Sequence, residues 1–229
     1  HNNRTALSFV TLARLDPSLI IELTATPAAD SNILHHVSAA ELKDAQMIKL
    51  PIILRGDPDW KEVVRLSKAE LEELAEAARA EELVSGEQLR PVMLIQAQAA
   101  RGVAPVTPDV VKRALIEDFA VPEAEIKIAT GTTWELDGID LAARDEPTRF
   151  IITVQALREG WDCPNAYVLC SLAEQRASTA VEQMLGRIMR LPKAKRKVDE
   201  RLNRAYAFAA TTSFADAARA LTEGLVANG

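Results

Sequence analysis

Short apolar runs of strand length alternate along the chain with longer segments in which apolar residues recur every three or four positions. Continuous apolar runs are typical of strands buried on both faces of a parallel sheet, and the longer segments predict helices. We therefore expect an α/β fold, a parallel sheet covered by helices. The predicted strands cover residues 19–24, 92–96, 126–129, 150–154, 167–171 and 206–210.

Helix starts are marked by capping residues. Ser67 and Glu70 have the spacing of a capping box. Thr107 followed by Pro108 supplies an N-cap and a first-turn proline for another helix. Two further helices are expected at residues 179–190 and 214–226.

Two segments lack a regular pattern and are expected to connect elements. Residues 55–61 contain Gly56, Pro58 and Trp60, which favour a connector. Residues 130–148 are expected to form a loop with a short turn at 136–141. A domain boundary is predicted near residue 50.

Composition narrows the class of protein. The 229 residues are 48% hydrophobic and 26% charged, as in ordinary globular proteins, and the net charge of −6 restricts any nucleic-acid binding to a local surface. No apolar run reaches the length of a membrane span, and the first five residues are polar, unlike a signal peptide. Cys163 and Cys170 match neither a metal-binding nor a disulfide pattern, so we expect a cytoplasmic protein.

The segment 183–190, QMLGRIMR, carries the strongest functional signal. Gln183, Arg187 and Arg190 share one face of the predicted helix, and Gly186 allows close backbone approach. Charged runs on helices usually face water, but the apolar neighbours of these arginines indicate that they are aimed at a partner. A guanidinium group suits phosphate oxygens, and arginines from a second domain stabilise a transferring phosphoryl group.

This segment resembles motif VI of superfamily 2 helicases, Q-x-x-G-R-x-x-R, at all four fixed positions. Residues 158–164, REGWDCP, follow a predicted strand and resemble motif V. The resemblance implies that Gly160 and Asp162 lie beside the nucleotide. It also implies that Thr153 and Arg158 belong to the nucleic-acid path, whereas Trp161 is interpreted as a packing residue.

Two further segments resemble helicase motifs. Residues 22–27, ELTATP, are similar to motif III, which couples the nucleotide site to the nucleic-acid groove through Thr24 and Thr26. Residues 94–98, LIQAQ, resemble motif IV and imply that Gln96 lies near the nucleic acid. The four motifs occur in the order found in the family, which strengthens each of them.

The residues of these motifs are most similar to those of the helicase-like subunit of type III restriction enzymes, where a DEAH box precedes a stretch like HNNRT. This resemblance implies that His1 ends that box and lies at the nucleotide site with Gly186. It implies that residues 1–50 are the end of a first RecA-like domain and residues 51–229 the second, with ATP bound between the two.

The same resemblance implies that Gln183, Arg187 and Arg190 are catalytic, and that Mg²⁺ is held by acidic residues missing from this chain. The sequence also contains no G-x-x-x-x-G-K-[ST] phosphate loop, so we do not expect the chain to hydrolyse ATP alone. No metal site is assigned to its own residues.

Two functions remain. The first is the motor part of an ATP-dependent DNA translocase or helicase, whose expected partners are DNA, an N-terminal RecA-like domain and a methyltransferase or specificity subunit. The second is a non-catalytic module that binds nucleic acid or protein. Residues 187–204 contain eight basic and two acidic side chains, which form either a solvated loop or a contact with the DNA backbone.

Overall fold

The computed structural model describes residues 6–21, 32–101, 104–154, 161–174 and 178–227. The chain divides into two compact units, residues 1–37 and 38–229. In the first unit the regular element is helix α1 (Ala6–Ala13). The second unit begins at Ser38, earlier than the predicted boundary near residue 50. That residues 1–50 end a first RecA-like domain and residues 51–229 form the second stays a prediction.

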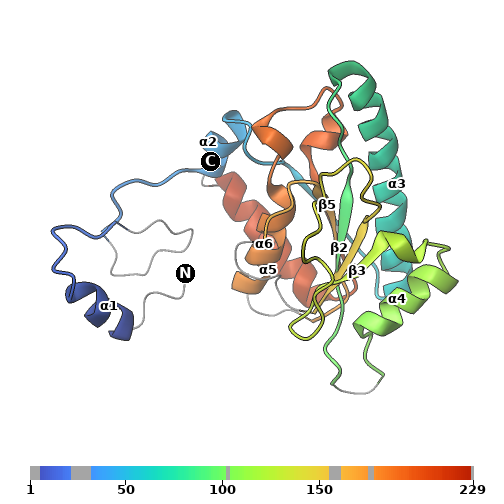
Figure 1. Ribbon diagram of the computed structural model, residues 1–229, viewed down its shortest axis with the longest axis horizontal. Coiled ribbons are helices and arrows are strands. Elements are labelled where there is room, and N and C mark those ends of the chain that lie inside the picture. Colours follow the sequence, from blue (N-terminus) through green and yellow to red (C-terminus); the bar gives the residue numbers. More distant parts are fainter. Residues whose placement is uncertain (1–5, 22–31, 102–103, 155–160, 175–177, 228–229) are drawn as a thin grey trace. The chain divides into compact units, whose positions relative to one another are not determined.

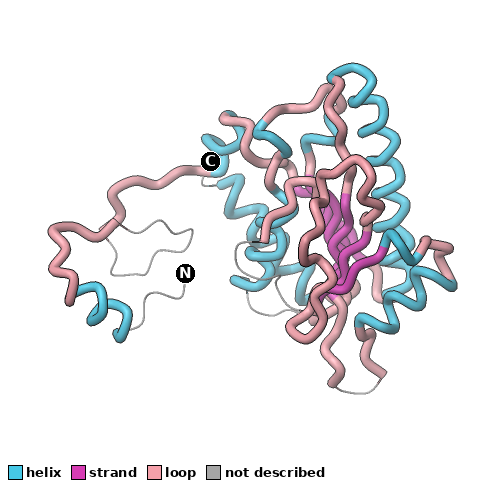
Figure 2. The backbone as a smooth tube through the Cα atoms, viewed as in Figure 1, coloured by secondary structure: helices cyan, strands magenta, loops and turns pink. Residues whose placement is uncertain are grey.

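The second unit is built on a six-stranded sheet in which all neighbouring strands are parallel, in the order β1-β6-β5-β2-β4-β3. Figure 2 shows the strands between two groups of helices. Strands β2, β4, β5 and β6 are buried at every position, as their continuous apolar sequences predicted. The strands are β1 (Ile52–Gly56), β2 (Val92–Gln96), β3 (Ile126–Ile128), β4 (Phe150–Thr153), β5 (Ala166–Ser171) and β6 (Ala205–Ala209).

Helices cover both faces of this sheet (Figure 1). Helices α3 (Trp60–Ser85) and α4 (Pro108–Glu117) pack on one face, and α5 (Ser178–Met189) and α6 (Thr212–Ala227) on the other. Helix α2 (Ala39–Asp44) contacts α6, and 3₁₀ turns cover Glu123–Glu125, Pro192–Ala194 and Glu200–Asn203. The predicted α/β class, a parallel sheet with helices on both faces, is confirmed.

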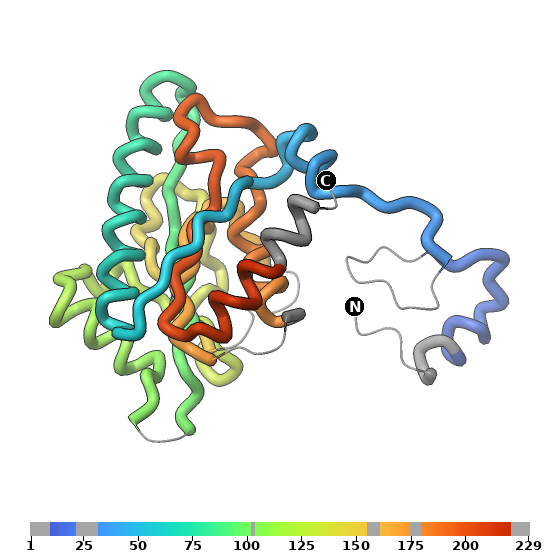
Figure 3. Tube along the Cα trace, turned by 180° about the vertical axis from the view of Figure 1, so that it is seen from behind, coloured from blue at the N-terminus to red at the C-terminus, as the bar shows by residue number. Residues whose placement is uncertain are grey.

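Strand β1 was missed, and of residues 55–61, which were interpreted as a connector, residues 57–59 connect two elements while the rest belong to those elements. Arg55 and Gly56 end β1, and Trp60 begins α3. β1 lies at the border of the sheet beside β6 (Figure 3), and its partial exposure shortens the apolar run by which a strand is recognised. A Cβ at Gly56 would lie 2.9 Å from the Ala209 carbonyl oxygen, so glycine permits this close approach.

The predicted start of α3 was also wrong. Asp59 is the N-cap, and its carboxylate accepts a hydrogen bond from the Lys61 amide at 2.9 Å. Ser67 lies inside the helix and donates its hydroxyl to the Val63 carbonyl. The capping-box spacing of Ser67 and Glu70 therefore lies inside a helix whose N-cap is Asp59.

The predicted strand at residues 19–24 was wrong in its described part. Residues 19–21 have no regular structure, and Leu19 and Ile21 are 70% and 66% exposed. An apolar run becomes a strand only where another strand supplies backbone partners, and the described residues of the first unit supply none. Residues 22–24 lie outside the described residues.

Strand β3, at the other border of the sheet, is followed by a turn that pairs with it. The Ile128 amide donates to the Glu135 carboxylate at 2.6 Å, and the Glu135 amide donates to the Ile128 carbonyl at 2.9 Å. The Ile126 amide donates to the Glu123 carbonyl. The outward backbone amides of both β3 isoleucines are therefore bonded within the chain.

Cys163 and Cys170 are free and buried. Burial raises the pKa of the Cys163 thiol to about 11 and that of the Cys170 thiol to about 12. Both thiols are therefore protonated, and unreactive, at neutral pH. None of the helices in the described ranges combines the length and apolar character needed to cross a membrane.

Candidate functional site

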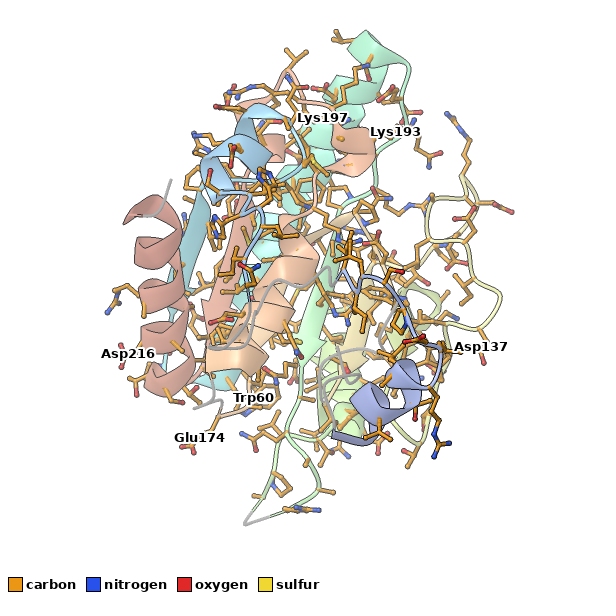
Figure 4. All side chains as sticks on the ribbon, turned by 90° about the vertical axis from the view of Figure 1, so that its left-hand side faces the viewer. Trp60, Asp137, Glu174, Lys193, Lys197 and Asp216 are labelled. Carbon is orange, nitrogen blue, oxygen red and sulfur yellow. The ribbon has the colours of Figure 1, made fainter. Side chains whose placement is uncertain are left out.

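The parallel sheet has an amino end, where its strands start, and a carboxyl end, where they finish. Helix α5 follows β5 and has 12 residues, about 18 Å of length, so its last turn returns to the amino end. Residues 161–165 directly precede β5 and lie at the same end. Figure 4 shows this separation, since Lys193 and Lys197, after α5, lie far from Trp60 and Glu174, after β1 and β5.

Asp162 and Arg190 join the turn before β5 to the end of α5. The Arg190 Nη1 lies 2.7 Å from the Asp162 Oδ2, and the two side chains are 59% and 44% exposed. The Arg190 backbone is fixed, because it forms an antiparallel bridge with Ile48. The structure therefore holds the backbone of this arginine while leaving its guanidinium accessible.

Arg187 lies beside Trp161. Its Nη1 donates to the Trp161 carbonyl, and its Cζ lies 5.8 Å from the centre of the indole ring. Burial and the neighbouring charge of Arg190 lower the pKa of Arg187, and Asp162 opposes that shift. Trp161 also packs against the core beneath α5, so it combines packing with the orientation of an arginine.

Gln183 and Gly186 lie on the exposed side of α5. A Cβ at Gly186 would meet nothing within 4 Å, so the space for a close approach is open from outside. Met184, Leu185 and Ile188 form the buried side of the helix. The apolar neighbours of the arginines therefore anchor α5 to the sheet and present the polar side outward.

Lys49 lies beneath this site and was not singled out from the sequence. Its Nζ donates to the carbonyls of Pro164 at 3.1 Å and Ala166 at 2.6 Å, and lies 3.7 Å from the centre of the Tyr167 ring. The side chain is fully buried, and burial lowers its pKa well below the usual value. The available signal was a lysine inside the apolar sequence IKLPIIL.

The carboxyl end of the sheet carries a different polar set. Thr153, Gln96 and Ser171 lie in register on β4, β2 and β5, and all three are buried. The Ser171 hydroxyl donates to the Gln96 Oε1 at 2.8 Å. Sequence reasoning found Gln96 and Thr153 but missed Ser171, whose role depends on strand order.

The basic segment, residues 193–204, pairs within the chain. Glu87, just after α3, lies 3.9, 3.3 and 3.6 Å from the ammonium groups of Lys193, Lys195 and Lys197. A hydrogen bond from Lys195, together with the charges of all three lysines, lowers the pKa of Glu87. Two further ion pairs of 2.7 Å join Arg196 to Glu200 and Arg201 to Asp199.

Five of the residues assigned from the motifs, His1, Thr24, Thr26, Arg158 and Gly160, lie outside the described residues. Within the described ranges no group of three or more His, Cys, Asp or Glu side chains is arranged to hold a metal ion. The described site thus consists of two guanidinium groups, one carboxylate and the elements that position them.

Comparisons with known proteins give two sequence relatives. The chain is 44% identical over 52 residues to the Type III restriction-modification enzyme EcoPI Res subunit of Escherichia phage P1 and, equally, to the EcoP15I Res subunit of Escherichia coli. The match covers 23% of this chain and 5% of each relative, so the chain spans a small part of their length. The resemblance to helicase-like type III restriction subunits is confirmed over this stretch. No family model matches the chain.

Among the solved structures that are similar to the chain, two are 13% identical to it. The C-terminal domain of S. cerevisiae Dbp5, bound to Gle1 and IP6, matches 80% of this chain and 86% of its own, with a TM-score of 0.40. The ATP-dependent Type ISP restriction-modification enzyme LlaBIII, bound to DNA, matches 74% of this chain and 12% of its own, with a TM-score of 0.38.

Proposed function

We propose that this chain is the second half of an ATP-dependent DNA translocase or helicase motor of the type III restriction kind. In this proposal ATP binds between two RecA-like domains, and Arg187 and Arg190 act on its phosphates. The observation that carries the proposal is the placement of both guanidinium groups beside residues 161–162, at one end of the sheet. The sequence relatives support the same class of protein.

The geometry suits this chemistry. An exposed ion pair contributes at most about 1 kcal/mol, so Arg190 can exchange Asp162 for a phosphate oxygen at low cost. Arg187 is already oriented by Trp161, which reduces the side-chain entropy lost when it meets a phosphate. Two such groups stabilise the negative charge that spreads over the transferring phosphoryl oxygens.

The same arrangement suggests roles for the other residues of the site. Asp162 would lie beside the nucleotide once Arg190 has turned to the phosphates, and Gln183 and Gly186 would face the other domain. The Mg²⁺ that accompanies ATP is expected on the preceding domain, as the resemblance to the helicase family implies. A methyltransferase or specificity subunit is a proposed partner of the whole protein.

The test uses a longer polypeptide that includes the phosphate loop and acidic residues of the first domain. Arg187→Ala or Arg190→Ala should lower ATP turnover about 10³- to 10⁵-fold while nucleotide binding is retained. Arg190→Lys should rescue poorly, because an ammonium group cannot make the planar two-point contact. The matched control is Arg79→Ala, an exposed arginine on α3, on the opposite face of the sheet.

Steady-state rates within tenfold of the unchanged polypeptide would reject the assignment of the two arginines. Nucleic-acid-stimulated phosphate release by the 229-residue chain alone would contradict the division of the motor between two domains. A longer polypeptide that binds nucleic acid but hydrolyses no ATP would favour the non-catalytic module instead.

A further inference from the structure

We infer that Lys49 is the residue that positions Asp162 against Arg190, by tying the turn before β5 to the end of α5. Its consequence for catalysis rests on the proposed function. The contacts of Lys49 concern the described structure alone. The positioning role of Lys49 is therefore tested in two ways, by an experiment that does not depend on ATP hydrolysis and by the ATPase activity itself.

The first tie is made by the side chain. The Nζ of Lys49 donates to the carbonyl oxygens of Pro164 and Ala166, residues 115 and 117 positions away in the sequence. These two carbonyls lie on either side of the point where the turn enters β5. The Lys49 Nζ therefore fixes the segment that carries Asp162.

The second tie is made by the backbone of the same segment. The Lys49 amide donates to the Met189 carbonyl at 2.5 Å, and Ile48 forms a bridge with Arg190. One short stretch of chain thus holds the end of α5 through its backbone and the turn before β5 through a side chain. The distance between Asp162 and Arg190 depends on both ties.

The charges around Lys49 explain why a lysine can occupy this place. Burial lowers the pKa of Lys49, while the nearby negative charge of Asp162 opposes that shift. The face of the Tyr167 ring, 3.7 Å away, also favours a cation. A methionine would fill the same space but would leave the Pro164 and Ala166 carbonyls without this donor.

The first experiment measures how firmly the turn before β5 is held. The labelling rates of the two cysteines of the chain report on two different places in the structure. Cys163 lies in the turn and Cys170 in the centre of the sheet, and both are buried. In Lys49→Met, labelling of Cys163 by a thiol reagent, followed by peptide mass spectrometry, should accelerate at least tenfold with little change at Cys170. The control is Leu115→Ala, a core truncation in α4 on the opposite face, which should not accelerate Cys163 relative to Cys170.

The second experiment measures catalysis in the longer polypeptide. Lys49→Met should lower kcat at least tenfold and change the KM for ATP less than threefold. The reason is that Lys49 positions Asp162 against Arg190, and Arg190 acts on the transition state and not on nucleotide binding. Leu115→Ala, assayed where both variants are folded, should keep kcat within twofold. A general loss of folded protein would lower both variants alike.

The outcomes separate the two proposals. Unchanged Cys163 labelling in Lys49→Met overturns the positioning role, whatever the ATPase result. Faster labelling with unchanged kcat overturns its importance for catalysis. If the unchanged longer polypeptide hydrolyses no ATP, the proposed function fails, and the labelling result still decides whether Lys49 holds the turn.

Discussion

The two ends of the sheet differ in what their polar residues are able to do. At the amino end, Arg190 and Asp162 form an ion pair in which both side chains are largely accessible to solvent. At the carboxyl end, Gln96, Thr153 and Ser171 are buried between strands and helices. An accessible ion pair can change partners at little cost, whereas a buried hydrogen-bonded group is costly to leave unpaired. Chemistry is therefore expected at the first end and stability at the second.

The comparison also bears on the predicted roles of the carboxyl end. Gln96 is 1% exposed and its side-chain oxygen is held by Ser171, so in this conformation its role is to fix the ends of β2 and β5. Contact of Gln96 or Thr153 with nucleic acid stays a prediction. Both side chains are buried in this conformation, so nucleic acid could touch them only if they became accessible.

The largest effect should come from Arg190, and it should fall on activity alone. Arg190→Ala is expected to cost about 10³-fold or more in turnover of the longer polypeptide. In the 229-residue chain it should change the free energy of unfolding by less than about 1 kcal/mol, because the pair with Asp162 is exposed. Urea denaturation checks this, and a larger loss would show that the arginine is structural.

The carboxyl end should respond in the opposite way. Gln96→Leu should lower the free energy of unfolding by about 1 to 3 kcal/mol, because the buried Ser171 hydroxyl loses its 2.8 Å acceptor and keeps the Ala173 carbonyl at 3.5 Å. Adding Ser171→Ala should recover part of this loss, since both partners are then apolar. A double-mutant cycle by urea denaturation measures the coupling, and additive effects would contradict the hydrogen bond.

Lys49 gives a pH-dependent effect at the amino end. Because burial lowers its pKa in the folded chain, the unfolded chain holds an extra proton between that lowered pKa and the usual lysine value. Stability relative to Lys49→Met should therefore rise with pH through this window, with a slope approaching about 1.4 kcal/mol per pH unit. Urea denaturation of both proteins from neutral to alkaline pH tests the sign, and parallel curves would contradict it.

The smallest effect should come from the basic segment. Glu87→Gln removes the carboxylate near three lysines, so duplex-DNA binding by the longer polypeptide should strengthen. The slope of log affinity against log salt should steepen by up to about 0.9 for each lysine released to a phosphate. Glu123→Gln, which frees only Lys112 on α4, is the control. Equal slopes would mean that the basic segment is a solvated surface.

Much of the fold was predictable because the central strands are buried on both faces. β2 was predicted at its exact residues, and β4, β5 and β6 to within one residue at either end, since a continuous apolar run leaves few alternatives. β1 was missed because only one of its sides pairs with a strand, which weakens the apolar signal. The start of α3 was misplaced because Ser67 and Asp59 both suit an N-cap, and local sequence does not choose between them.

From the sequence, helical spacing and the motif resemblance pointed to Arg187, Arg190 and Asp162, but not to the residues that hold them in place. The spacing of Gln183, Arg187 and Arg190 predicted one shared helix face, and in the structure α5 ends at Met189, one residue before Arg190. Lys49 bonds to carbonyls more than a hundred residues away, and Lys195 pairs with Glu87 at a separation of 108 residues. Such contacts depend on strand order and helix ends, which local patterns do not contain.

The turn that follows β3 has a consequence for association between molecules. A border strand with unbonded backbone groups can accept an extended peptide or a strand of another copy, which leads to sheet extension and aggregation. Here the Glu135 carboxylate and amide bond to Ile128, and the Ile126 amide bonds to Glu123. A strand from outside would have to displace these bonds first, so growth of the sheet across β3 is opposed by the chain's own next turn.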